Sequence, residues 1–294
     1  MPVELPDGVR EMAGAGALAP LARSGPSPLL TLTDEEMLVL YGNAGKEQFA
    51  SPWLDRLAVD RGQSFDVGML MATARRSMLA RGMIAPEVVL AAAEKRTVAV
   101  DPQLMSANLL ITGVLTRRNH SVVRLEAFSD APEERGAHHV FVDRDGTVLH
   151  EQTSPDGLHH FMMQGVADSV GLLRSFVLGR EVTQDDASSS DTDEEAVLDW
   201  RGNTDAAATD PALLEHSGSL VAETRIYLSG QTPAVKGELH LVSGRNGLLI
   251  LQPDAEHSDD EGMATAQKVS VDELGDMLEY LVGGAAEDDA DGRS

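Results

Sequence analysis

One stretch near the end of the chain, residues 221–282, has the pattern of a complete small folding unit. Its apolar runs are bounded by turn residues and have the length of β-strands. The Asn246-Gly247 dipeptide suits a tight hairpin turn, because both residues tolerate positive φ. The strand-length runs are residues 221–228, 235–242, 248–251 and 262–269.

A helix is predicted to close this unit at residues 271–282. Ser270 and Glu273 have the spacing of a capping box, in which each side chain accepts a hydrogen bond from a backbone amide at the helix start. The apolar residues of the helix recur at helical spacing and form one stripe. These residues are Leu274, Met277, Leu278 and Leu281. The stretch therefore predicts three or four antiparallel strands with a helix over one face.

The same order of elements occurs about 100 residues earlier, a spacing too long for a solenoid and typical of a duplicated half-domain. Asp145-Gly146 marks a hairpin turn there. A helix follows at residues 166–178, with an apolar stripe of its own. The predicted fold is therefore α+β, with pseudo-two-fold duplicated antiparallel sheet-plus-helix halves. The strands of the earlier copy are residues 122–128, 137–142, 147–151 and 158–162.

Before the first sheet unit, the pattern predicts a helical N-terminal part. Thr33 and Glu36 fit a capping box, and Gly42 provides a helix end. Asp101-Pro102 is a helix-start signal, which predicts a helix reaching residue 115. Further helices are predicted at residues 65–81 and 85–95.

The charge of the chain is concentrated outside these elements. The formal net charge is −25, and residues 181–210 hold ten acidic residues against a single Arg201. Such runs keep a segment extended and solvated, so they predict a linker and a tail. A short helix is expected within the linker, around residues 194–200. The predicted organisation is a flexible arm (1–28), N-terminal helices plus first sheet-and-helix half (29–180), acidic linker (181–217), second half (218–283) and acidic tail (284–294).

Composition narrows the class of protein. The chain has no cysteine, which excludes disulfides, thiolate metal sites and a cysteine nucleophile. It has no apolar run long enough for a membrane span and no basic start followed by an apolar signal region. We therefore expect a cytoplasmic protein without membrane insertion.

Histidines in the first sheet unit are the only cluster that suggests chemistry. Adjacent histidines on a strand point to opposite faces, and no acidic residue stands at a metal-ligand spacing beside them. Solvent-exposed strand histidines are the expected outcome. The motifs of nucleophile elbows, phosphate loops and dinucleotide sites are absent from the sequence. We therefore expect no enzyme, no cofactor, and no catalytic, cofactor-binding or metal-binding residue. The histidines are His138, His139, His150, His159 and His160.

A DNA-binding alternative rests on three arginines. The N-terminal helices followed by a hairpin could make a winged helix, with Arg75, Arg76 and Arg81 facing DNA. The strongly acidic balance disfavours this alternative, because binding of phosphates requires a basic face. No nucleic-acid partner is therefore expected.

Several short motifs resemble one known family. Arg75-Arg-Ser-Met-Leu-Ala-Arg-Gly-Met-Ile84 followed by Val100-Asp-Pro-Gln-Leu104 is similar to the EspG family, the proteins associated with type VII (ESX) secretion. The resemblance extends to Leu32-Thr-Asp-Glu-Glu-Met37, Asn246-Gly-Leu-Leu-Ile-Leu-Gln-Pro253 and Val269-Ser-Val-Asp-Glu-Leu274. It touches most of the chain from Leu32 to Val282 through short, mainly structural motifs. The family is also similar in architecture, with a pseudo-two-fold pair of sheet-and-helix halves.

The resemblance implies a cytosolic, non-enzymatic chaperone that binds a helical secretion substrate, PE/PPE-like or WXG-type. The segment between residues 84 and 100 is longer than the family pattern, and the acidic linker and tail are heavier. The partner-contacting residues of the family do not fall on matching motifs, so none is carried over. The alternatives that stay open are a winged-helix regulator and an α/β scaffold protein of unknown role.

Overall fold

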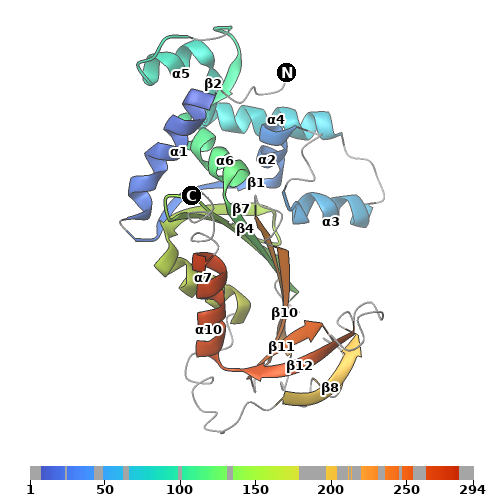
Figure 1. Ribbon diagram of the computed structural model, residues 1–294. Helices are drawn as coiled ribbons and strands as arrows, with labels where there is room; N and C mark the ends of the chain where they lie inside the picture. Colours follow the sequence, from blue (N-terminus) through green and yellow to red (C-terminus); the bar gives the residue numbers. More distant parts are fainter. Residues whose placement is uncertain are drawn as a thin grey trace. The chain divides into compact units, whose positions relative to one another are not determined.

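The structure is a computed structural model of a mixed α+β protein (Figure 1). Its described part divides into two compact units, Met1–His120 with Leu149–Gln164, and Ser121–Val148 with Gly165–Ser294. The predicted α+β class is thus confirmed. The structure describes residues 8–23, 25–42, 49–61, 66–98, 101–130, 135–178, 197–203, 211, 213, 220–230, 236–244, 247–253 and 263–284.

The first unit combines most of the helices with a short run of strands. Its strand order is β1-β7-β6, and β2 pairs with β3 separately. The helices are α1 Gly8–Ala22, α2 Asp34–Tyr41, α3 Pro52–Arg61, α4 Val67–Ala80, α5 Glu87–Ala93 and α6 Leu109–His120. The strands are β1 Ser27–Thr33, β2 Ile84–Pro86, β3 Met105–Ala107, β6 Thr147–Thr153 and β7 Leu158–Gly165.

The prediction of a flexible arm over residues 1–28 is wrong where the structure describes that segment. Helix α1 packs along α6 (Figure 1), and β1 already begins at Ser27. The buried residues of α1 recur at every fourth position, which places them on one face. Three of the four are small or charged, so this face does not show as an apolar stripe in the sequence. They are Arg10, Gly14, Leu18 and Ala22.

Helix α2 begins and ends as its sequence predicts. The Thr33 hydroxyl accepts a hydrogen bond from the Glu36 amide at 3.2 Å, and the Glu36 carboxylate accepts one from the Thr33 amide at 3.3 Å. Gly42 follows the helix with φ 71°, a conformation that favours glycine. The capping box and the helix end are therefore confirmed.

The helix predicted from Asp101 begins instead at Leu109. Asn108 provides the cap, because its Oδ1 accepts a hydrogen bond from the Ile111 amide at 3.0 Å. Asp101 closes a turn, in which its carboxylate accepts the amide hydrogen of Gln103. Between the two lies β3, whose pairing with β2 the local sequence pattern does not reveal. The other two predicted helices are present as α4 and, after β2, α5.

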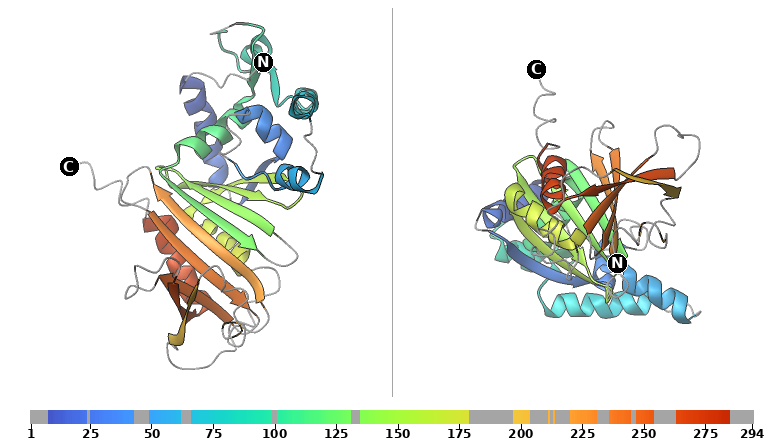
Figure 2. Two further views of the ribbon diagram at one scale, coloured as in Figure 1. Left: turned by 90° about the vertical axis from the view of Figure 1, so that its right-hand side faces the viewer. Right: turned by 90° about the horizontal axis from the view of Figure 1, so that it is seen from below.

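The second unit is a sheet with helices on one face. Its strand order is β5-β4-β9-β10-β11-β12-β8. Helices α7 and α10 lie together against this sheet (Figure 2), over an apolar core that includes Leu125, Ile226 and Leu274. The elements are β4 Val123–Asp130, β5 Arg135–Val142, α7 Val166–Leu178, β8 Val197–Asn203, β9 Leu220–Gly230, β10 Lys236–Gly244, β11 Gly247–Pro253, β12 Met263–Val269, α10 Val271–Glu279 and the π-helical turn Tyr280–Gly284.

The predicted strands of both copies are present, and the order of four strands and a helix occurs twice. The first strands of the two copies, β4 and β9, pair antiparallel, with Leu125 opposite Leu228. A two-fold axis perpendicular to the sheet, between these two strands, would produce this antiparallel arrangement. Duplication itself stays a prediction. The compact units also do not follow the predicted ranges 29–180 and 218–283, since β4, β5 and α7 group with the later strands.

The acidic linker contains a strand where a helix was expected. Residues 197–203 form β8, which pairs antiparallel with β12, so the helix predicted around residues 194–200 is wrong over its described part. The edge of β12 offers backbone partners to this segment, and helical periodicity does not reveal such partners. Most of the predicted linker, and the tail beyond residue 284, lie outside the described residues.

The capping box of α10 predicts a measurable loss of stability. The Ser270 hydroxyl accepts the Glu273 amide hydrogen at 3.1 Å, and the Glu273 carboxylate accepts that of Ser270 at 2.6 Å. We expect Ser270→Ala to lower the free energy of unfolding by about 1 kcal/mol. Urea unfolding followed by circular dichroism measures it. The matched control is Ser175→Ala on α7, where the hydroxyl only donates to the Gly171 carbonyl. Equal effects of the two changes would contradict a role of the cap.

Candidate functional site

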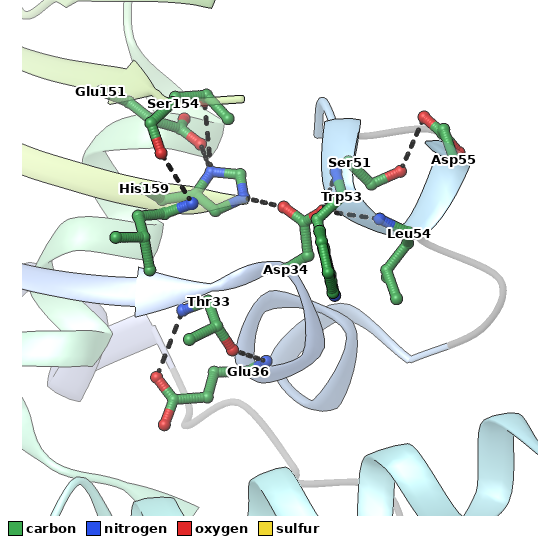
Figure 3. A network of polar contacts seen from close by, with 12 residues as sticks. Thr33, Asp34, Glu36, Ser51, Trp53, Leu54, Asp55, Glu151, Ser154 and His159 are labelled. Atoms are coloured by element: carbon green, nitrogen blue, oxygen red, sulfur yellow. Dashed lines mark hydrogen bonds and ion pairs between the residues drawn. The ribbon is translucent and has the colours of Figure 1, made fainter. Parts of the chain in front are cut away.

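The site is built at the junction of β1 and α2. Thr33 caps α2, which leaves Asp34 as the first helical residue with its side chain free to point elsewhere. The Asp34 Oδ2 atom accepts hydrogen bonds from the backbone amides of Trp53 at 2.9 Å and Leu54 at 3.1 Å (Figure 3). Asp34 therefore caps the start of α3 as well, where a carboxylate also interacts favourably with the helix dipole.

His159 on β7 lies between two carboxylates (Figure 3). Its Nε2 atom is 2.9 Å from Asp34 Oδ1, and its Nδ1 atom is 2.8 Å from Glu151 Oε1. All three side chains are completely buried. Two residues 125 positions apart in the sequence, Asp34 and His159, are thus in direct contact.

Arg118 on α6 completes the group. Its Nε atom donates to Glu151 Oε2 at 2.7 Å, and its Nη1 atom donates to the Tyr41 hydroxyl at 2.9 Å. Its guanidinium also lies 5.2 Å from the centre of the Tyr41 ring, within cation–π range. We call Asp34, Arg118, Glu151 and His159 the buried ion cluster.

The protonation of the cluster follows from its contacts. Burial by itself disfavours the charged form of His159, but the hydrogen bonds to Asp34 and Glu151 outweigh it and raise its pKa above the ordinary value. Burial opposes the charge of Arg118 too, and Glu151 and Tyr41 raise its pKa. The contacts within the cluster therefore favour the charged forms of His159 and Arg118, each of which lies against a carboxyl group.

The pKa of His150 on β6, next to Glu151 in sequence, is shifted in the opposite direction. Its Nε2 atom is 2.8 Å from Gln164 Nε2, and burial lowers its pKa to about 3. His150 is therefore neutral at physiological pH, whereas the carboxylates beside His159 favour its charged form. The pKa values of these two histidines are thus shifted in opposite directions, because only His159 contacts carboxylates.

The expectation of solvent-exposed strand histidines is wrong for four of the five. His138, His139, His150 and His159 are buried, and His160, which contacts the Thr31 hydroxyl, is exposed. His138 packs against Phe176 of α7 with ring centroids 5.3 Å apart. Alternation along a strand predicts a solvent-exposed face only where nothing covers that face of the sheet. Here the adjacent residues His138 and His139 are both buried, so neither face is exposed at this point of the strand.

The cluster positions structural elements. General acid–base catalysis requires a group within reach of a substrate, and no side chain of the buried ion cluster is more than 1% exposed. Among the residues that the structure describes, no three His, Cys, Asp or Glu side chains are placed to hold a metal ion. What the arrangement does is fasten α2, α3, α6, β6 and β7 to one another through hydrogen bonds.

The three arginines of the DNA-binding alternative differ in their surroundings. Arg81 donates to both carboxylate oxygens of Glu36, at 2.8 and 3.0 Å, and to the Thr31 carbonyl at 3.1 Å. Arg75 is half-buried and Arg76 is exposed. Arg81 therefore fastens the end of α4 to β1 and the start of α2.

The outer face of α1 is an exposed helix face made of apolar residues. Met12 is 71% exposed and Val9 84% exposed. No residue of this face carries an ionisable side chain, although the chain has a net charge of −25. We define the outer face of α1 as the exposed residues Val9, Met12, Ala13, Gly16, Ala17, Pro20 and Leu21.

The opposite side of α1 is firmly anchored. Arg10 forms an ion pair with Glu94 at 2.8 Å, and Arg117 of α6 donates to the Ala15 carbonyl at 2.8 Å. Gly14 and Gly113 cross so closely that a Cβ added to Gly14 would lie 2.8 Å from the Gly113 amide nitrogen. The outer face is thus presented on a fixed helix.

Comparisons with known proteins give no assignment: no protein-family model matches the chain, and no curated protein matches it. Among the helices that the structure describes, none combines the length and the apolar character that crossing a membrane would require.

Proposed function

We propose that this protein is a cytoplasmic, non-enzymatic chaperone or adaptor that binds a helical substrate of a type VII (ESX) secretion system, PE/PPE-like or WXG-type. The observation that supports the proposal best is the outer face of α1, an anchored helix with an exposed apolar surface. The substrate class comes from the resemblance to the EspG family.

The chemistry of the outer face favours a helix as its partner. A contiguous exposed apolar surface is a common mark of a protein interaction site. Ala13, Gly16 and Ala17 leave room for another backbone to come close, and Met12 adapts its shape to the partner. Recognition of an apolar helix uses contact residues three or four positions apart, the spacing of Ala13, Gly16 and Ala17.

Charge favours a different protein over a second copy of this chain. Two copies would each bring a net charge of −25, and their repulsion opposes self-association. The outer face offers no cation to a nucleic acid, since Val9, Met12 and Leu21 are its largest side chains. A different protein that offers an apolar helix face avoids the repulsion between two copies. It also needs no cation on the outer face of α1.

The test is a pull-down with the tagged full-length protein from native cytosol, read by mass spectrometry. We expect recovery of a small helical ESX substrate, and at least about a tenfold loss of it with Ala17→Glu, because the new carboxylate would be desolvated in the interface. The matched control is Ala167→Glu, an exposed alanine on α7, which should leave recovery unchanged.

Two outcomes would contradict the proposal. If Ala17→Glu recovered the substrate as well as the unchanged protein does, the outer face of α1 would not be the contact surface. If nucleic acid were recovered and lost at high salt, the winged-helix regulator would replace the chaperone. Circular dichroism of both variants checks that they are folded.

A further inference from the structure

The buried ion cluster contains one group that changes charge within a physiologically accessible range of pH, His159. We infer that His159 is a proton-dependent clasp: it holds Asp34 and Glu151 together while both of its ring nitrogens carry a hydrogen, and it releases one of them when a proton leaves. The clasp is independent of the proposed binding function, because it involves no residue of the outer face of α1.

The two hydrogen bonds of His159 define the charged state. An ionised carboxylate only accepts hydrogen bonds, so the contacts at 2.9 Å to Asp34 and 2.8 Å to Glu151 both require an N–H on the ring. A neutral imidazole has one N–H and one lone pair. Loss of the proton therefore turns a lone pair toward a carboxylate oxygen, and that contact becomes repulsive.

The groups around the ring show which contacts each carboxylate keeps after His159 loses a proton. Glu151 keeps the ion pair with Arg118 at 2.7 Å, and Arg118 in turn keeps the Tyr41 hydroxyl. Asp34 keeps only the backbone amides of α3. The Thr153 hydroxyl lies 3.4 Å from Nδ1. Two aromatic rings also contact it: Phe49 meets the ring edge-on and Phe161 stacks on it.

The direction of the pH effect follows from the raised pKa of His159. Because the folded protein holds this proton more tightly than the unfolded chain does, the clasp contributes fully below the ordinary histidine pKa of about 6.5. Its contribution falls as the pH rises through the higher pKa of the folded state. The clasp is therefore closed below the ordinary histidine pKa and opens on the alkaline side of it.

His150 produces a slope of the opposite sign, which separates the two histidines. Burial lowers its pKa to about 3, so the unfolded chain binds a proton more readily than the folded protein. Its contribution to stability is present above the ordinary histidine pKa and is lost as the pH falls below about 6.5. An effect on the alkaline side therefore cannot come from His150.

The experiment is a pH titration of the full-length protein labelled in its histidine rings, followed by NMR. We expect His159 to show two protonated ring nitrogens at pH 7, with its transition above the ordinary histidine range. In the same interval, urea unfolding should show a folding equilibrium constant that falls by up to about tenfold per pH unit, the slope of one linked proton. A neutral imidazole spectrum for His159 at pH 7 would overturn the inference.

A pair of variants on one strand provides the second test. His159→Gln cannot carry the charge and should remove the alkaline slope, while His160→Gln, which changes the exposed neighbour, should keep it. Retention of the full slope in His159→Gln would assign it to another group and overturn the clasp. If His159→Gln fails to fold, the NMR spectrum of the unchanged protein still decides, because it reads the protons on the ring directly.

Discussion

Glu151→Gln is expected to lower the free energy of unfolding by about 3 to 5 kcal/mol, because it leaves Arg118 buried without its counter-ion. The amide of glutamine can still accept one hydrogen bond, but it carries no charge to balance the guanidinium. Removal of one partner from a buried pair costs more than the pair contributes when intact, since the desolvated charge remains. Thermal and urea unfolding, each followed by circular dichroism, measure the loss.

The matched control is an ion pair in the same unit that is open to solvent. Arg56 and Asp156 lie 3.9 Å apart, with side chains 44% and 83% exposed. Asp156→Asn should therefore change the free energy of unfolding by less than about 1 kcal/mol. An effect of Glu151→Gln no larger than that of Asp156→Asn would mean that the buried ion cluster does not hold the unit together.

A double variant separates the cost of an orphaned charge from the value of the pair. Combining Arg118→Met with Glu151→Gln removes both the guanidinium and the carboxylate that it neutralises. The double variant should be more stable than Glu151→Gln alone, because no arginine charge is left buried without a partner. A double variant less stable than Glu151→Gln would indicate that Arg118 acts mainly through packing against Tyr41.

Local sequence signals predicted the elements that depend on neighbouring residues. Both capping boxes, Thr33 with Glu36 and Ser270 with Glu273, form as their spacing indicates. In such boxes each donor and its acceptor lie within one helical turn, so the sequence contains both partners. The strands of the two sheet-and-helix halves are predictable for a similar reason, since each has the apolar character of a buried strand and is bounded by turn residues.

The buried ion cluster could not be predicted in the same way. Its members belong to different elements, and the contact of Asp34 with His159 bridges 125 positions. The sequence indicates that Thr33 caps α2, but not that the next residue turns toward a second helix. Burial of His159 depends on Phe49 and on Asp34, neither of which is near it in the chain. Only the tertiary fold brings these partners together.

The helix α1 was missed because its packing depends on glycine. A hydrophobic stripe is the usual sign of a helix that packs on a core, and α1 has Gly14 at the centre of its buried face. Glycine weakens the apolar pattern and lowers the helix propensity, yet it allows α1 to approach α6 closely. The same residues that predict a flexible arm thus form a close helix crossing.

Gly113→Ala is the second change with a large expected effect. A Cβ at this position of α6 would lie 2.5 Å from the Gly14 carbonyl oxygen and 2.6 Å from its carbon, closer than real contacts allow. Helices α1 and α6 would have to separate, and the Arg117 bond to the Ala15 carbonyl would be strained with them. We expect a loss of about 1 to 3 kcal/mol in the free energy of unfolding, measured by urea unfolding.

Gly16→Ala is the control, and it is expected to change the stability in the opposite direction. Gly16 lies on the outer face of α1, the other helix of this crossing, and a Cβ there would meet nothing within 4 Å. Alanine favours a helix over glycine by up to about 1 kcal/mol, so this variant should be more stable than the unchanged protein. Equal stability of the two variants would show that α1 does not pack on α6 through Gly113. Opposite signs would establish that one face of α1 is held by close contact while the other is open to a partner.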